Sequence, residues 1–185
     1  MKSDWKSHLA MSATYFRMIA SLPIVLIVMF PFPNYSWVVA ILFILASLTD
    51  WLDGYWARKY DSVSDIGKLM DPIADKLLVL GALIMLLSLG RVDPVMVLLL
   101  LARDIYIGGI RSAAAAESII IAARPLGKWK TGVQMTGIPC LLLENEGLPL
   151  PLHFIGYFLL WVSVLLSLAS GLEYTIGYYK NRKTV

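Results

Sequence analysis

Four aspartates stand at helical spacing on either side of a short polar stretch between two apolar segments. The stretch reads DWLDGYWARKYDSVSDIGKLMDPIADK. Because each residue of a helix turns about 100°, Asp50 and Asp53 share a face where the first segment ends. Asp71 and Asp75 likewise share a face where the next segment begins. One Asp at the centre of a membrane helix costs roughly 2.5–3.5 kcal/mol. Four aspartates at the ends of two apolar segments therefore indicate a functional site.

The residue types suggest what this site does. Carboxylates that meet repel one another unless cations lie between them, and Mg²⁺ and Mn²⁺ prefer oxygen ligands, including substrate phosphates. Two such ions on four carboxylates can clamp a pyrophosphate and stabilise an in-line displacement. Gly54 and Ala57, on the same face as Asp50, allow close approach, and Arg58 can donate two hydrogen bonds to a phosphate. Asp61 and Asp65 are interpreted as parts of a charged loop.

The composition indicates the setting of this site. The chain has 185 residues, of which 58% are hydrophobic and 16% charged, whereas about 25% are charged in an ordinary soluble domain. About 20 apolar residues span a bilayer as a helix. We therefore expect an all-α integral membrane protein, one domain over residues 1–185, with six transmembrane helices in one bundle after a short amphipathic N-terminal helix. The expected spans are Ala13–Phe30, Trp37–Tyr55, Leu69–Leu89, Val95–Ala116, Trp129–Leu143 and Leu148–Tyr179.

The cations predict the orientation. With six spans, the termini and the loops after the second and fourth spans share one side. That side is rich in Lys and Arg. The opposite loops, near 31–36, 90–94 and 144–148, contain Arg91 as their only Lys or Arg. The positive-inside rule then places both termini and the aspartates at the cytoplasmic side of a multi-pass membrane protein. We attribute the net charge of +3 to topology and contact with membrane lipids, and expect no nucleic acid partner.

The spacing also carries a resemblance. The pattern D-x2-D-G-x2-A-R-x8-G-x3-D-x3-D, from Asp50 to Asp75 through Gly67, resembles in full the signature of the CDP-alcohol phosphatidyltransferase family. The resemblance implies a homodimeric membrane enzyme that displaces CMP from a CDP-linked lipid. It implies that the four aspartates hold two divalent ions, Mg²⁺ or Mn²⁺, and that Asp75 is the general base. It also implies that Gly54, Ala57, Arg58 and Gly67 line the nucleotide and diphosphate site.

The rest of the chain bears on the acceptor alcohol. Cations follow in LARDIYIGGIR and in RPLGKWKTG, and together they favour an acceptor that carries a phosphate. One alternative is a buried pairing of Asp104 with Arg111, which lie on one side of a helix, with Arg103 turned away from Asp104. Another is that Lys128 and Lys130 only mark the cytoplasmic side.

These segments resemble the bacterial phosphatidylglycerophosphate synthases of the same family. That resemblance implies CDP-diacylglycerol as donor, glycerol 3-phosphate as acceptor and a place in the bacterial inner (cytoplasmic) membrane. It implies that Arg103, Arg111, Lys128 and Lys130 hold the acceptor phosphate. His8 stands where relatives often have Asn, which leaves that contact with the nucleotide open.

Three alternatives stay open from the residues alone. The first is the same reaction with another acceptor, such as inositol phosphate, serine or a second lipid. The second is an aspartate-rich membrane prenyltransferase, which would be longer and have two separated motifs. The third is a divalent-metal transporter, which would carry its acids near the middle of the bilayer.

Overall fold

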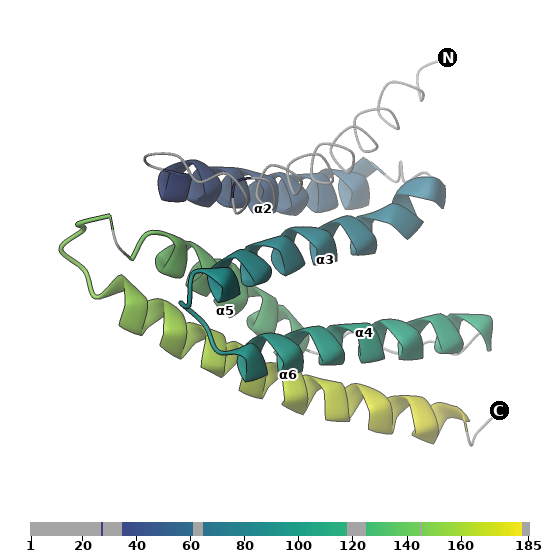
Figure 1. Cartoon of the computed structure of the whole chain (residues 1–185). Helices are drawn as coiled ribbons and strands as arrows, with labels where there is room; N and C mark the ends of the chain where they lie inside the picture. The colour runs from purple at the N-terminus through teal and green to yellow at the C-terminus, as the bar shows by residue number, and fades with distance from the viewer. Residues whose placement is uncertain (1–26, 28–34, 61–64, 118–124, 145, 183–185) are drawn as a thin grey trace, which may run out of the picture. The chain divides into compact units, whose positions relative to one another are not determined.

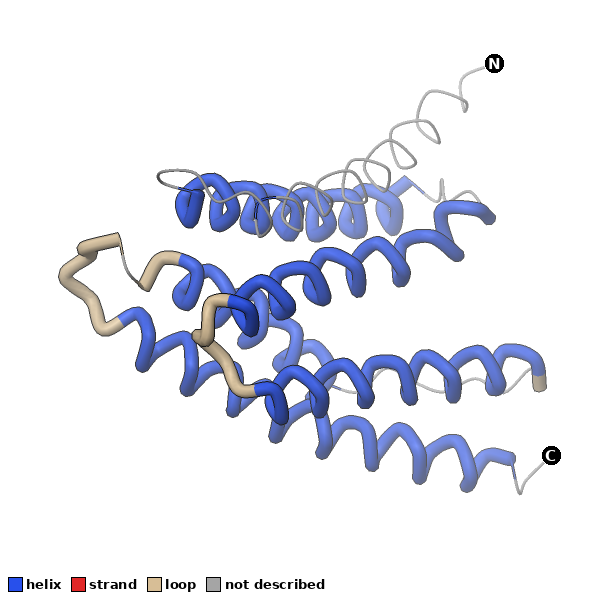
Figure 2. The backbone as a smooth tube through the Cα atoms, viewed as in Figure 1, coloured by secondary structure: helices blue, strands red, loops and turns tan. Residues whose placement is uncertain are grey.

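The computed structural model describes residues 27, 35–60, 65–117, 125–144 and 146–182, and the side chains among them outside 50–60 and 65–75. All the regular structure in these ranges is helical (Figures 1 and 2). The helices are α2 (Tyr35–Tyr60), α3 (Asp65–Ser88), α4 (Pro94–Ala116), α5 (Pro125–Leu142) and α6 (Leu152–Arg182). The predicted all-α class is therefore confirmed for the described residues.

Five of the six expected spans overlap helices α2 to α6, whereas the first, Ala13–Phe30, and the N-terminal amphipathic helix lie almost wholly outside the described residues. Within the described part, only α6 is long and apolar enough by itself to cross a membrane. The apolar parts of α2 and α3 are shorter, at Tyr35–Thr49 and Lys76–Ser88. Helix α4 has 23 residues but includes Arg103, Asp104 and Arg111. The six-span bundle thus stays a prediction.

The chain divides into two compact units. Helices α2 and α3 belong to the first, which covers residues 1–90 and 142–148. Helices α4 and α6 and nearly all of α5 belong to the second, which covers residues 91–141 and 149–185. The expectation of a single domain stays a prediction, and each unit is described by itself.

In the first unit, α2 and α3 lie side by side and run in opposite directions (Figure 1). Val39, Phe43 and Ala46 recur at helical spacing on α2 and are fully buried. Ala82 and Leu86, also at helical spacing, are fully buried on α3. Only residues 61–64 separate the two helices. The end of α2 and the beginning of α3, which carry the aspartates, are therefore close along the chain and belong to one hairpin.

In the second unit, hydrogen bonds made by side chains show the helix directions. Tyr157 on α6 donates a hydrogen bond to Asp93, just before α4, and Tyr178 near the end of α6 donates to Glu117, just after α4. Helices α4 and α6 therefore run parallel, as Figure 1 also shows. Helix α5 runs the opposite way, since Arg91, before α4, donates to the carbonyl of Leu141 near the end of α5 at 2.8 Å.

Two glycines allow α5 and α6 to approach closely. A Cβ atom built on Gly156 would lie 2.7 Å from Cγ of Leu141 and 2.9 Å from the carbonyl oxygen of Gly137. A Cβ built on Gly137 would lie 3.2 Å from the carbonyl oxygen of Gly156. Small residues of this kind are typical of close helix contacts in membranes, and this contact sets how α5 lies against α6.

The second unit is apolar outside and partly polar inside. Its exposed residues include Ile105, Phe154, Leu165 and Leu172, each at least 65% exposed. Its buried residues include several polar and charged side chains, namely Arg91, Lys130, Gln134, Ser163, Ser167 and Ser170. A soluble protein shows the opposite distribution. In a bilayer, by contrast, polar groups face the interior of the protein and apolar ones face lipid.

Candidate active site

The four aspartates lie where the sequence predicts, on helical backbone at the end of α2 and the start of α3. Helical register places Asp50 beside Asp53, Gly54 and Ala57 on α2. On α3 it places Gly67, Asp71 and Asp75 on a second face. The structure does not describe these side chains, so their roles stay predictions. The donor set itself, carboxylates from adjacent ends of one hairpin, fits hard divalent cations such as Mg²⁺ or Mn²⁺.

No competing metal site appears among the side chains that the structure does describe. Those side chains include no group of three or more His, Cys, Asp and Glu residues placed to hold a metal ion. The aspartates of α2 and α3 thus remain the candidates. Of the two loop aspartates, Asp61 lies outside the described residues, and Asp65 is the first residue of α3.

In the second unit, Arg103 of α4 joins α6 by two hydrogen bonds. Its Nε donates to the carbonyl oxygen of Ser167 at 2.9 Å, and its NH2 donates to Oγ of Ser170 at 2.7 Å. Its NH1 donates to Oδ1 of Asp104 at 3.0 Å. Because the guanidinium is a rigid planar fork, three contacts in different directions fix its orientation.

Lys130 of α5 completes this group. Its Nζ lies 2.8 Å from Oδ1 and 2.7 Å from Oδ2 of Asp104, and its side chain is only 7% exposed. The carbonyl of Lys130 accepts a hydrogen bond from Ser163 of α6 at 3.3 Å. Arg103, Asp104 and Lys130, which we call the buried charge cluster, therefore link all three helices of the second unit.

The cluster corrects one expectation. The sequence placed Arg103 away from Asp104 and offered Asp104–Arg111 as an alternative pair. Asp104 instead forms ion pairs with Arg103 and Lys130. The acceptors on α6 draw the long Arg103 side chain across the helix surface. Arg111 is exposed, and its guanidinium lies 5.2 Å from the centre of the Tyr174 ring on α6, in a cation–π contact.

The four predicted acceptor-binding cations thus fall into two groups. Arg103 and Lys130 meet at one carboxylate inside the unit, whereas Arg111 and Lys128 are exposed. Helix α5 begins at Pro125, four residues before the expected span, so both lysines lie in its first two turns. Of these four cations, the structure brings Arg103 and Lys130 together.

Two buried polar atoms close to the cluster have no hydrogen-bond partner in the described part of the chain. They are Nε2 of Gln134 and Oγ of Ser167, whose residues are 2% and 1% exposed. Gln134 lies one turn after Lys130 on α5, and Ser167 accepts a hydrogen bond from Arg103 through its carbonyl. Sequence reasoning missed both residues, as well as Ser170. The signal was present for Gln134, at i+4 from Lys130, but weak for serines in an apolar helix.

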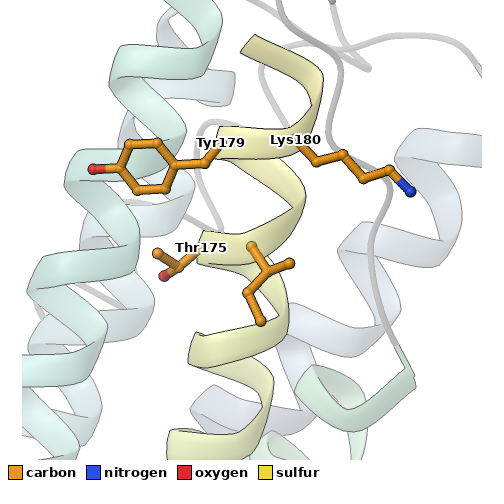
Figure 3. A pocket seen from close by; sticks show the side chains of 4 residues that line it. Thr175, Tyr179 and Lys180 are labelled. Carbon is orange, nitrogen blue, oxygen red and sulfur yellow. The ribbon is translucent and has the colours of Figure 1, made fainter. Parts of the chain in front are cut away.

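A surface pocket of about 450 Å³ lies elsewhere, near the end of α6 (Figure 3). Its lining residues are Thr175, Ile176, Tyr179 and Lys180, none of which the sequence predicted as a site residue. The side chains of Tyr179 and Lys180 extend to opposite sides of the helix. An open surface on one helix does not surround a ligand, so we assign no part of the reaction to it.

The chain is similar to known proteins over most of its length. A family model described as CDP-alcohol phosphatidyltransferase matches residues 7–169, which include both aspartate pairs and the buried charge cluster. A Bacillus subtilis protein named CDP-diacylglycerol–glycerol-3-phosphate 3-phosphatidyltransferase is 41% identical over 149 residues, covering 78% of this chain and 75% of its own length. A Rickettsia bellii protein of that name is 39% identical over 158 residues, covering 84% of this chain and 87% of its own.

Proposed function

The chain belongs to the CDP-alcohol phosphatidyltransferase family, and we propose that it transfers the phosphatidyl group of CDP-diacylglycerol to glycerol 3-phosphate. The products are phosphatidylglycerol phosphate and CMP. The observation that carries this proposal is the similarity to relatives named for that reaction, which extends over at least three quarters of the length of this chain and of both relatives. The helical placement of the aspartates and the buried cations support it.

The aspartates would hold the metal ions. Asp50 and Asp53 on α2, with Asp71 and Asp75 on α3, supply four carboxylates at adjacent ends of one hairpin. When bound, two Mg²⁺ or Mn²⁺ ions would neutralise the diphosphate charge and stabilise the departing CMP. Asp75 takes the proton of the acceptor hydroxyl as general base.

The neighbouring residues of the motif would hold the nucleotide. Gly54, Ala57 and Gly67 lack large side chains, so the cytidine and diphosphate can approach the helix backbone. Arg58 follows Gly54 by one turn and donates to the diphosphate. These assignments rest on the motif and on the helical register of α2 and α3.

The cations of the second unit would bind the phosphate of glycerol 3-phosphate. A phosphate dianion needs several charge-assisted donors. The partly buried Arg103 and the buried Lys130, which share the Asp104 carboxylate, are suited to it. Arg111 and Lys128, both exposed, would meet the acceptor as it enters from water. Serine, which has no phosphate, would gain little from these residues.

We place the enzyme in the bacterial cytoplasmic membrane as a multi-pass homodimer with both termini in the cytoplasm. The apolar length of α6, the apolar exterior of the second unit and the distribution of Lys and Arg support a membrane setting. In that setting the lipid chains of the donor stay in the bilayer while CMP leaves to water.

The test is CMP release by the purified protein in mixed micelles with CDP-diacylglycerol and Mg²⁺. Glycerol 3-phosphate, inositol phosphate and serine are offered separately, each with a chelator control. We expect chelator-sensitive release with glycerol 3-phosphate alone. Release with inositol phosphate or serine alone would keep the reaction class and overturn the acceptor. No release with any alcohol would overturn the function.

A further inference from the structure

We propose that Asp104 is a positioning residue for acceptor binding: its carboxylate holds the ammonium of Lys130 and the guanidinium of Arg103 at the place where the acceptor phosphate binds. This inference rests on the proposed function, and it gives Asp104 a role that the cation pattern alone does not suggest. Three observations carry it, namely the geometry of the carboxylate, the unused donors of Arg103 and the polar atoms left without partners.

The carboxylate of Asp104 contacts Lys130, which is buried, and Arg103, which is partly buried, at short range. Both of its oxygens lie within 2.8 Å of Nζ of Lys130, and Oδ1 also accepts from Arg103 at 3.0 Å. The side chains of Lys130, Arg103 and Asp104 are 7%, 15% and 21% exposed. A flexible lysine chain has many rotamers, so a carboxylate that accepts from it twice selects one position for the charge.

Arg103 keeps donors that its hydrogen bonds in the cluster do not use. The hydrogen bonds of Arg103 to Ser167, Ser170 and Asp104 use three of its five N–H donors. The other two N–H groups can donate to an anion that binds beside the cluster.

Unpartnered polar atoms next to the cluster point to a polar ligand. Gln134 Nε2 and Ser167 Oγ are buried without a hydrogen-bond partner, and a buried group in that state costs about 1–3 kcal/mol. Gln134 lies on the same face of α5 as Lys130, and Ser167 contacts Arg103 through its backbone. The hydroxyl and phosphate oxygens of the acceptor, or water that accompanies it, would satisfy these atoms.

The exposed cations lie outside the cluster. Arg111 lies over Tyr174, and Lys128 is exposed on α5. We therefore expect loss of the Asp104 carboxylate to act through Lys130 and Arg103 and to leave these two in place.

A double-mutant cycle separates positioning from simple stabilisation. The wild type, Asp104→Asn, Lys130→Gln and the double variant are purified, and kcat and KM are measured with glycerol 3-phosphate and with CDP-diacylglycerol. Asp93→Asn is the matched control, because it makes the same change just before the start of the same helix, away from the cluster. We expect Asp104→Asn to raise the KM for glycerol 3-phosphate by about 10- to 100-fold, with the KM for the lipid nearly unchanged.

The two substitutions should not be additive. Once Lys130 is replaced by Gln, loss of the Asp104 carboxylate can no longer displace an ammonium group. The double variant should therefore have a KM for glycerol 3-phosphate close to that of Lys130→Gln alone. Asp104→Glu, which keeps a carboxylate, should recover part of the acceptor affinity. A KM for glycerol 3-phosphate that Asp104→Asn leaves at the wild-type value, or effects that add fully in the double variant, would overturn the inference.

Further variants keep the test decisive if Asp104→Asn does not fold. Ser170→Ala removes an anchor of Arg103 without changing any charge, and it should raise the acceptor KM by a smaller factor. An unchanged acceptor KM in both Ser170→Ala and Asp104→Glu would then overturn the inference.

CMP release by the wild type distinguishes a failure of this inference from a failure of the proposed function. A wild type that releases CMP only with inositol phosphate would overturn the proposed acceptor, and the same KM series with that phosphate would still decide the role of Asp104. Release with serine alone, or with none, would overturn both.

Discussion

The two groups of charged residues in this protein are held in different ways. The aspartates belong to one hairpin, in which α2 and α3 are separated by residues 61–64 alone. The buried charge cluster joins residues from α4 and α5, and its Arg103 is anchored to α6. A local hairpin needs few distant contacts to form, whereas the cluster needs three helices packed in register. Changes in helix packing should therefore impair acceptor binding before they impair the metal site.

The largest effect should come from the hairpin. Asp50→Ala and Asp71→Ala should each lower CMP release by roughly 100- to 1,000-fold or more, because the metal ions that stabilise the diphosphate would lose a ligand. Asp61→Asn, in the link between the helices, is the control and should keep its activity. Each variant is checked for membrane insertion before its activity is measured. Activity near that of the wild type in either alanine variant would contradict the metal assignment.

A smaller effect should come from the exposed cations of the second unit. Arg111→Ala and Lys128→Ala should each raise the KM for glycerol 3-phosphate about tenfold, which corresponds to the loss of one charge-assisted hydrogen bond of about 1.4 kcal/mol. The KM for CDP-diacylglycerol should change less. Lys180→Ala, an exposed cation on α6, is the control. If neither variant changes the acceptor KM, these two residues only mark the cytoplasmic side.

The packing of α5 against α6 can be tested directly, since the buried charge cluster depends on three packed helices and the hairpin does not. Gly156→Ala would place a methyl group 2.7 Å from Leu141 and 2.9 Å from the carbonyl oxygen of Gly137. This overpacking should lower the free energy of unfolding by about 1–3 kcal/mol, as measured by thermal unfolding in detergent micelles. Gly132→Ala on the same helix pair meets nothing within 4 Å and should be neutral or stabilising. Equal stability of the two variants would show that the contact does not set the packing.

The smallest expected effect is on stability, and it should be smaller for an exposed arginine than for a buried one. Arg182 pairs with Glu117 at 3.1 Å, with 56% of its side chain exposed, so Arg182→Ala should cost about 1 kcal/mol or less, and less still in high salt. Arg91 is 7% exposed and donates to Leu141 at 2.8 Å. Arg91→Ala should cost more, about 1–3 kcal/mol, because it removes a buried hydrogen bond. Thermal unfolding of the two variants compares them, and the reverse order would contradict this ranking.

Sequence patterns predicted the helices well where apolar runs were long. The fourth span was expected to begin at Val95 and α4 begins at Pro94, and both end at Ala116, because Asp93 and Pro94 provide a local helix start. The fifth helix was less well predicted. Helix α5 begins at Pro125, ahead of the apolar run, since Lys128 and Lys130 are good helix formers that a hydrophobic pattern does not count.

The sequence by itself determined the aspartate motif, because residues three or four apart on one helix share a face whatever surrounds it. It also determined the apolar class of the chain and the family resemblance. Only the tertiary structure decided which cations meet. Arg103 and Lys130 are 27 positions apart and come together because α5 runs antiparallel to α4 and α6 supplies the acceptors that turn Arg103 toward Asp104. Such contacts depend on helix packing, and spacing along a single helix does not encode them.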